Sequence, residues 1–350
     1  MKRKTWALLT LAALAGAFLL LSALVIAVDP FQVYRLAQDY VPPIDNTTQV
    51  YSNAGIVRSY DYDSVIVGTS VTENFRPSQM DTLLGGRFIK LCSSAGTAYN
   101  HALLLDLAFD THEISRVVYG LDVYSFIGAL DETGTDMPFY LYDKNPFNDV
   151  QYWLNRSVLG SFLPRCLRTW GKTQDDSLRD SMYAWADQYV YGPTALDQTS
   201  FTPPVSRRAA DAYIQVALDN LNTHLIPYIT AHPETQFDIF FPPYSAAEWA
   251  SMENKGTFDG ILPLRRLCYD ALSAFANVRI YDFSAKEEWV TVIGNYKDAL
   301  HYGPWINDAI TECIARGENL VTDPAQIDEA DALLKTWALD QIAAGGWIFD

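Results

Sequence analysis

"VIVGTSVTENF", residues 65–75, joins a short apolar run to a polar segment in which a helix begins. The run before Gly68 is β-branched throughout and ends on a glycine, which is typical of a buried strand. Ser70 therefore stands just beyond the tip of that strand. A serine in this place either caps the next helix or acts as a nucleophile, and a nucleophile requires a base from elsewhere in the chain.

The rest of the chain repeats this pattern of strand and helix. Further apolar strands are predicted at 87–94, 116–126, 237–243 and 278–283. Apolar residues at helical spacing lie between them, at 97–110, 207–232 and 262–276. Such alternation predicts an α/β fold, a three-layer doubly wound sandwich around a mostly parallel five-stranded sheet. Chemistry is then expected at the carboxyl ends of the strands, where Ser70 lies.

The amino terminus predicts a membrane anchor. Lys2, Arg3 and Lys4 precede an uncharged run from Thr5 to Val28, which as a helix spans about 36 Å and can cross a hydrocarbon core. The basic residues are expected to stay in the cytoplasm, which directs the rest of the chain outward. A cleaved signal peptide is the alternative, because residues 25–27 loosely fit a small-residue cleavage site, but its apolar region would be unusually long.

Three parts follow from this reading. Residues 1–28 form the cytoplasmic tip and transmembrane anchor, 29–59 a stalk and lead-in, and 60–350 the α/β domain. Between about 127 and 204 the alternation stops, and aromatic residues with two helical patches predict a helical insertion in that domain. The insertion either forms a cap that shapes substrate access or elaborates the packing.

Composition excludes several classes of function. The formal net charge of −17 leaves no basic stripe for a phosphate backbone, so nucleic acid is not expected as a partner. The four cysteines form no C-x-x-C pair and are interpreted as buried thiols, with a disulfide open to an exported domain. The sequence has no metal-ligand cluster, Walker loop or G-x-G-x-x-G, so it implies no metal and no cofactor.

One histidine has the spacing of a catalytic base. His301 follows Asp298 by three residues, after the last predicted strand, and a carboxylate there can hold one ring nitrogen while the other stays free. Asp282, at the end of that strand, is a competing acid, but Asp298 is preferred because its link to His301 is local. The remaining histidines lie in or beside helical patterns and are interpreted as surface or helix-end residues: His101, His112, His224 and His232.

These residues together resemble the SGNH, or GDSL-like, hydrolase superfamily over about residues 64–315. Residues 68–70 resemble its first block, with threonine in place of the usual aspartate, and Gly96 matches the glycine of the second block. Residues 120–122 fall where the family has glycine-x-asparagine, and Asp298 with His301 resembles the last block. The resemblance implies a nucleophile at Ser70, a base at His301 and an orienting acid at Asp298. It also implies an oxyanion held by the backbone N–H groups of Ser70 and Gly96.

Asp122 departs from the family pattern, because asparagine would donate a hydrogen bond to the oxyanion and an ionised aspartate cannot. Asp122 either points away as a structural residue, is protonated in an apolar site, or marks a domain that has lost hydrolase activity; the first is favoured. Arg76 either neutralises Asp122, binds an anionic substrate, or is a surface residue. Further candidates for substrate binding near the strand ends are Thr69, Asn74 and Tyr244.

An anchor joined to such a domain is similar to the D-alanyl-lipoteichoic acid biosynthesis membrane protein and to partners in bacterial polysaccharide acetylation. The resemblance implies an extracytoplasmic, single-pass serine O-acyltransferase or esterase. Its expected partners are a cell-envelope glycan or teichoic-acid-like polymer and a membrane-bound O-acyltransferase. The rival interpretation is a catalytically inactive adaptor or glycan-binding module that keeps the fold.

Overall fold

The computed structural model describes residues 3–208 and 211–349. These residues form two compact units that interleave along the chain. Unit 1 contains residues up to 60 together with 136–176, and unit 2 contains 61–135 together with 177–350. All of the predicted site residues belong to unit 2.

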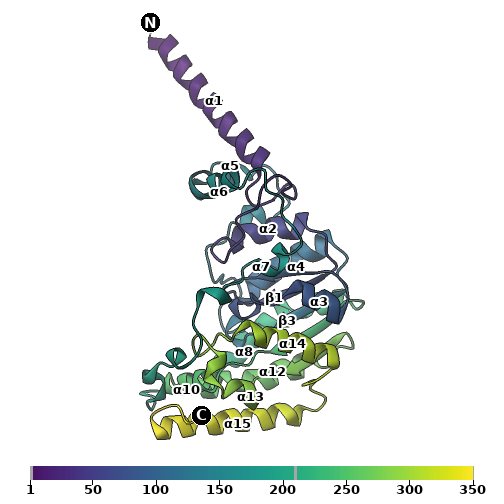
Figure 1. Ribbon diagram of the computed structural model, residues 1–350, viewed down its shortest axis with the longest axis vertical. Helices are drawn as coiled ribbons and strands as arrows, with labels where there is room; N and C mark the ends of the chain where they lie inside the picture. The colour runs from purple at the N-terminus through teal and green to yellow at the C-terminus, as the bar shows by residue number, and fades with distance from the viewer. Residues whose placement is uncertain (1–2, 209–210, 350) are drawn as a thin grey trace. The chain divides into compact units, whose positions relative to one another are not determined.

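A single five-stranded parallel sheet forms the centre of unit 2 (Figure 1). Its strands are β1 Ser64–Gly68, β2 Phe88–Cys92, β3 Arg116–Gly120, β4 Gln236–Phe241 and β5 Val278–Asp282. They lie in the order β2-β1-β3-β4-β5, and every neighbouring pair is parallel. All residues of β1 and β2 are buried, as expected of strands covered on both faces. The predicted α/β class and the five strand positions are confirmed.

Helices cover both faces of this sheet. Because connections between parallel strands are right-handed, α3 (Pro77–Leu84) lies on the opposite face from α4 (Ala98–Thr111), α8 (Asp211–His224) and α12 (Pro263–Leu272). The contacts agree, since α3 packs on α14 (Pro304–Arg316), while α8 packs on both α4 and α12. The remaining α-helices of unit 2 are α7 Leu178–Ser181, α9 Ile226–Ala231, α10 Ala246–Asn254, α11 Phe258–Ile261, α13 Glu287–Val290 and α15 Pro324–Ala344. Its 3-10 helices are η1 Ser70–Thr72, η2 Val123–Phe126, η5 Ala186–Gln188, η6 Pro193–Ala195, η7 Gln198–Phe201 and η8 Ile293–Asn295.

The glycines that end β1 and β3 make room for one threonine side chain. A Cβ atom on Gly68 would lie 2.5 Å from Cγ2 of Thr72, and a Cβ atom on Gly120 would lie 2.6 Å from the same methyl group. The Thr72 hydroxyl donates to the carbonyl of Thr69 at 2.8 Å, which closes the turn after β1. Glycine therefore ends these strands because Thr72 packs against both of them. From β1 the chain first adds β2 on one side and then β3 on the other, so this contact lies at the switch point of the sheet.

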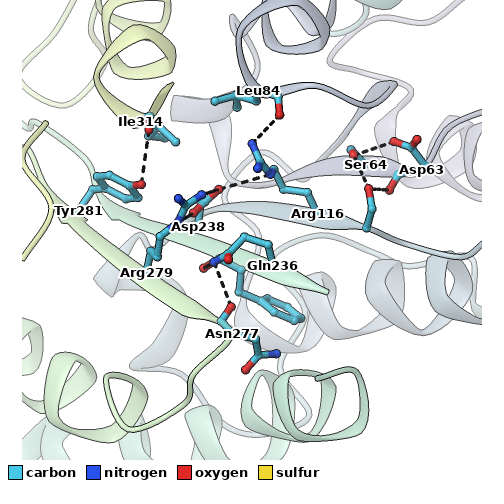
Figure 2. Close-up of polar contacts among 12 residues, drawn as sticks. Asp63, Ser64, Leu84, Arg116, Gln236, Asp238, Asn277, Arg279, Tyr281 and Ile314 are labelled. Atoms are coloured by element: carbon cyan, nitrogen blue, oxygen red, sulfur yellow. Dashed lines mark hydrogen bonds and ion pairs between the residues drawn. The ribbon is translucent and has the colours of Figure 1, made fainter. Parts of the chain in front are cut away.

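The amino end of the sheet holds a buried charge cluster, drawn in Figure 2. Asp238 of β4 is fully buried and accepts two hydrogen bonds from Arg279 of β5, at 2.7 and 3.0 Å. Nε of Arg116, on β3, lies 3.7 Å from the same carboxylate. A buried carboxylate requires such partners, so the three residues tie β3, β4 and β5 together at the edge away from Ser70.

Unit 1 is built around the end of a long apolar helix. Its helices are α1 Arg3–Val28, α2 Gln49–Ser59, η3 Phe139–Leu141, α5 Val150–Trp153, the π-helix η4 Val158–Phe162 and α6 Leu163–Arg168. Most of α1 is bare, and only its last turns are covered, at Ser22, Val25 and Val28. Helices α5 and α6 contact α1 (Figure 1). The long apolar helix is confirmed, and its exposure is unlike that of a soluble protein's core helix.

The segment after α1 is folded. The Asp29 side chain is fully buried and accepts hydrogen bonds from the backbone N–H groups of Val33, Tyr34 and Arg35. The hydroxyl of Tyr152 donates to the same carboxylate at 3.1 Å. The segment predicted as a stalk, 29–59, thus packs into unit 1. The predicted insertion is divided, because 136–176 belongs to unit 1, while 127–135 and 177–204 belong to unit 2. All four cysteines are buried free thiols.

We expect Gly120→Ala to lower the free energy of unfolding by about 1–3 kcal/mol, because its methyl group overlaps Cγ2 of Thr72. Adding Thr72→Ser removes that methyl group while keeping the hydroxyl, so the double variant should be more stable than Gly120→Ala alone. Denaturant melts of the four-member cycle measure this coupling. Gly294→Ala is the control, since its Cβ atom would meet only Val292 at 4.0 Å. Additive effects in the cycle would contradict the contact.

Candidate active site

The structure brings Ser70, His301 and Asp298 into one hydrogen-bonded row, although Ser70 and His301 are 231 residues apart. Oγ of Ser70 lies 2.7 Å from Nε2 of His301. Nδ1 of the same ring lies 2.9 and 2.8 Å from the two carboxylate oxygens of Asp298. With Nδ1–H donating to the carboxylate, Nε2 is the acceptor for the serine hydroxyl. This is the relative arrangement of nucleophile, base and orienting acid.

Local backbone structure sets both ends of the row. Ser70 is the first residue of η1, directly after β1, so its side chain stands at the carboxyl edge of the sheet. Asp298 Oδ1 accepts the backbone N–H groups of Leu300 and His301, at 3.0 and 2.8 Å, which closes the turn that carries the imidazole. Burial raises the Asp298 pKa, but the hydrogen bonds and positive field of His301 outweigh it and hold that pKa below its usual value. The carboxylate is therefore ionised at neutral pH.

Trp185 is a site residue that the sequence did not reveal. Its indole N–H donates to the carbonyl of Ser70 at 3.1 Å, and its ring stands edge-on to the His301 imidazole at 5.5 Å. Nζ of Lys297 lies 4.1 Å from the centre of the Trp185 ring and 3.9 Å from that of Tyr189. Burial lowers the pKa of this lysine, although the neighbouring Asp298 acts in the opposite direction. The segment 185–189 thus belongs to the site and fixes the backbone of Ser70.

A buried lysine donates hydrogen bonds to the end of the turn that begins at Ser70. Lys90, on β2, is fully buried, and its Nζ donates to the carbonyls of Glu73 and Asp180 at 2.9 and 2.7 Å. Burial lowers its pKa to about 8. These bonds join the end of the turn that begins at Ser70 to the segment that leads to Trp185.

Of the two predicted backbone donors for an oxyanion, one is free. Among the described residues, no group accepts a hydrogen bond from the Ser70 N–H. The Gly96 N–H, in contrast, donates to the carbonyl of Ser93 at 2.8 Å, so it is not available in this conformation. The Ser93–Gly96 hydrogen bond has a local cause, because Ala95 has a left-handed backbone (φ 52°) and closes a tight turn over residues 93–96.

Asp122 supplies no oxyanion donor, and the structure favours the first interpretation made for it. One carboxylate oxygen accepts the hydroxyl of Tyr244 at 2.5 Å and the backbone N–H of Tyr124 at 3.0 Å. The other accepts the hydroxyl of Thr69 at 2.9 Å. Burial raises the Asp122 pKa above its usual value, although these three donors act in the opposite direction. Asp122 is therefore a structural acceptor that joins the ends of β1 and β3 to Tyr244.

The candidates for substrate binding make contacts within the protein. Thr69 and Tyr244 are the two hydroxyl donors to Asp122. Arg76 does not reach Asp122, and instead forms a two-bond ion pair with Asp308 at 2.8 and 2.9 Å. Asn74 accepts the backbone N–H groups of residues 185 and 186 through its side-chain oxygen. Asn74 therefore positions the Trp185 segment.

The competing acid and two of the remaining histidines make contacts inside the protein. Asp282 is paired with the buried Arg265, so it does not compete for His301. His101 was expected at the surface or a helix end but is fully buried, with Nδ1 2.7 Å from the Tyr119 hydroxyl. Burial lowers its pKa to about 4. His224 is the last residue of α8, a helix end as predicted, and its ring is buried against the carbonyl of Leu130. Apolar neighbours on α4 and α8 carry both rings into the core.

Comparisons with known proteins add little to this geometry. No family model and no curated protein matches the sequence. A solved structure from Streptococcus pneumonia, described provisionally as a platelet activating factor, is similar with 9% identity and a TM-score of 0.41. The similarity covers 78% of this chain and 91% of that chain. The fold described above rests on the strand order and register of this chain.

We expect Trp185→Phe to lower kcat/KM for a small activated ester about 2- to 10-fold. The phenyl ring keeps the packing, while the loss of the hydrogen bond to the Ser70 carbonyl removes about 0.5–1.5 kcal/mol. Trp305→Phe is the matched control, because its indole N–H donates to the side chain of Asn295 instead. Equal kcat/KM in Trp185→Phe and the unmodified chain would show that this bond does not position Ser70.

Proposed function

We propose that this chain is a membrane-anchored serine O-acyltransferase or esterase of the SGNH-like type, acting on a cell-envelope glycan outside the cytoplasmic membrane. The observation that carries the proposal is the row from Asp298 through His301 to Ser70, with all its hydrogen bonds formed. Its place at the carboxyl edge of a parallel sheet, beside the switch point, also fits an active site.

The first half of the reaction acylates the serine. As Ser70 Oγ forms a bond to the acyl carbon of the donor ester, its proton moves to Nε2 of His301. The Asp298 carboxylate keeps the imidazole oriented and stabilises its positive form. When the tetrahedral intermediate collapses, the bond to the leaving oxygen breaks and His301 returns the proton to that oxygen. The product is an acyl ester on Ser70 and a released alcohol.

The second half removes the acyl group. His301 Nε2 takes a proton from an incoming hydroxyl, whose oxygen attacks the acyl ester, and then protonates Ser70 as it leaves. A sugar hydroxyl makes the protein a transferase, and water makes it an esterase. Both outcomes use the same acyl-enzyme, so the residues described here serve either one.

The amino terminus supports the proposed location. Helix α1 has a mean hydropathy of 2.7 over its most apolar window, and among the described residues it is the one helix long and apolar enough to span a membrane. Lys4 at its start favours a cytoplasmic amino end. The cleaved-signal alternative would remove Ser22 and Val25, which are buried where α1 packs in unit 1, and would uncover the residues that pack on them. A permanent anchor is therefore the better proposal.

The charge of unit 2 bears on the choice of acceptor. Residues 61–135 and 177–350 hold 34 acidic and 15 basic residues. A polyanionic, teichoic-acid-like chain would meet repulsion on approach, whereas a neutral glycan would not. We therefore place a neutral glycan ahead of a polyanionic polymer as the acceptor.

A second candidate function is a catalytically inactive adaptor or glycan-binding module. The observation that favours it is the set of oxyanion donors, because Gly96 N–H is bonded to Ser93 and Asp122 is an acceptor. Removing a single such donor from an active enzyme costs about 2.7–4 kcal/mol. The enzyme proposal thus requires the 93–96 turn to rearrange when substrate binds.

Covalent labelling separates the two candidates. A fluorophosphonate probe should label the full-length protein on Ser70 and should leave Ser70→Ala unlabelled, because only a serine activated by His301 attacks the phosphorus. Ser93→Ala, on the neighbouring turn, is the control serine and should be labelled. The modified residue is located by mass spectrometry. A folded protein that the probe does not label would favour the adaptor.

We expect transfer from a small acyl ester to a neutral glucan oligosaccharide to be faster than transfer to a polyglycerol phosphate of similar length. The difference should shrink as ionic strength rises from about 0.01 M to 0.15 M, because the Debye length falls from about 30 to 8 Å. Product formation by chromatography measures both rates. Faster transfer to the anionic chain at low salt would contradict the charge argument.

A further inference from the structure

Unit 1 exposes basic and apolar side chains beside the outer end of α1. We define the juxtamembrane surface as Leu154, Arg156, Leu167, Arg168, Trp170 and Lys172. All six side chains are exposed, and the three apolar ones retain 43%, 47% and 53% of their accessible area in chain order. Three large apolar side chains exposed on one short stretch are typical of an interaction surface.

The charge of this stretch is opposite to that of the protein. Residues 150–174 contain four basic residues and no acidic one, in a chain of net charge −17. Arg165 is used internally, since it pairs with Asp45 at 2.7 Å. Among the described residues, Arg156, Arg168 and Lys172 have no acidic partner. Three cations are therefore available to an anionic surface.

The packing of α5 and α6 on α1 indicates where this surface lies relative to the lipid bilayer. A hydrocarbon core of about 30 Å is crossed by about 20 helical residues, so a helix whose inner end is Lys4 leaves the core near residue 24. The residues of α1 covered by unit 1 are Ser22, Val25 and Val28, which lie at this point. Because α5 and α6 contact α1, we expect the stretch that contains them to lie level with the lipid headgroups.

The connection between α1 and this surface is rigid. Arg35 donates to the carbonyls of Ile26 and Ala27 at the end of α1, and the buried Asp29 carboxylate holds the turn between them. The Trp170 ring stacks on Tyr40, whose hydroxyl donates to the Asp29 carbonyl at 2.6 Å. Between Arg35 and Trp170 lies a pocket of about 220 Å³, also lined by Ala27, Val28 and Asp39.

We propose that the juxtamembrane surface binds anionic phospholipid headgroups of the outer leaflet, so that unit 1 lies on the membrane. Tryptophan is typical of this interface, with its ring among the headgroups, and leucine side chains enter just below them. Each arginine or lysine near an anionic surface adds about 1 kcal/mol of attraction. The inference rests on the proposed membrane anchor but not on the chemistry of Ser70.

The test uses the full chain in nanodiscs of three parts phosphatidylcholine to one part phosphatidylglycerol. The native cysteines are buried, so an NBD fluorophore can be attached at Leu167→Cys. Quenching of the NBD fluorescence is measured in two samples. The nitroxide quencher, placed high on the acyl chain, is carried only by phosphatidylglycerol in one sample and only by phosphatidylcholine in the other. We expect phosphatidylglycerol to quench at least about twofold more per lipid, and the R156Q/R168Q/K172Q variant to lose this preference. K255Q/R316Q/K335Q, which removes three exposed cations of unit 2, should keep it.

Each other outcome contradicts the proposal in its own way. Equal quenching per lipid would show that the surface lies at the membrane without selecting anionic lipid, and no quenching would show that it does not lie at the membrane. Fluorophosphonate labelling of the same samples reports folding and the site, so loss of lipid preference with labelling intact contradicts this inference alone. A purified chain shortened near Asp29 would contradict the anchor itself.

Discussion

The contact of Thr72 with Gly68 and Gly120 is the constraint on which the rest of the site depends. It lets the tight turn after β1 pack between the ends of β1 and β3, at the switch point of the sheet. That turn places the Ser70 side chain at the carboxyl edge and leaves its N–H unused by the protein. A Cβ atom at either glycine would overlap Cγ2 of Thr72, so the turn that carries Ser70 would have to shift.

Much of the fold could be predicted because buried parallel strands appear in the sequence as short apolar runs. Each strand overlaps its predicted segment, with β4 beginning one residue before it at Gln236, and their parallel order brings residues far apart in the chain to one edge. Asp298 and His301 could be paired because their spacing is local. Ser70 could be joined to them because each follows a strand of the same sheet.

The parts that could not be predicted depend on backbone direction and long-range packing. Nothing in the sequence around Gly96 shows that its N–H turns toward Ser93, since this follows from the left-handed Ala95. Trp185 lies in a segment without regular strands, and its contact with Ser70 depends on Asn74, which holds two backbone N–H groups of that segment. The role of Asp122 likewise comes from three donors on separate elements. The compact packing of 29–59 depends on partners a hundred residues later, such as Tyr152.

The interleaving of the two units has a consequence for the order of folding during synthesis. Unit 1 cannot cover the end of α1 until α5 and α6 have been made, at residues 150–168. By then β1, β2 and β3 already exist, but one edge of β3 has no partner until β4 emerges at residue 236. An unpaired strand edge is a template for wrong pairing. The growing chain therefore passes through a stage in which unit 1 has closed while an open, aggregation-prone half-sheet waits for its remaining strands.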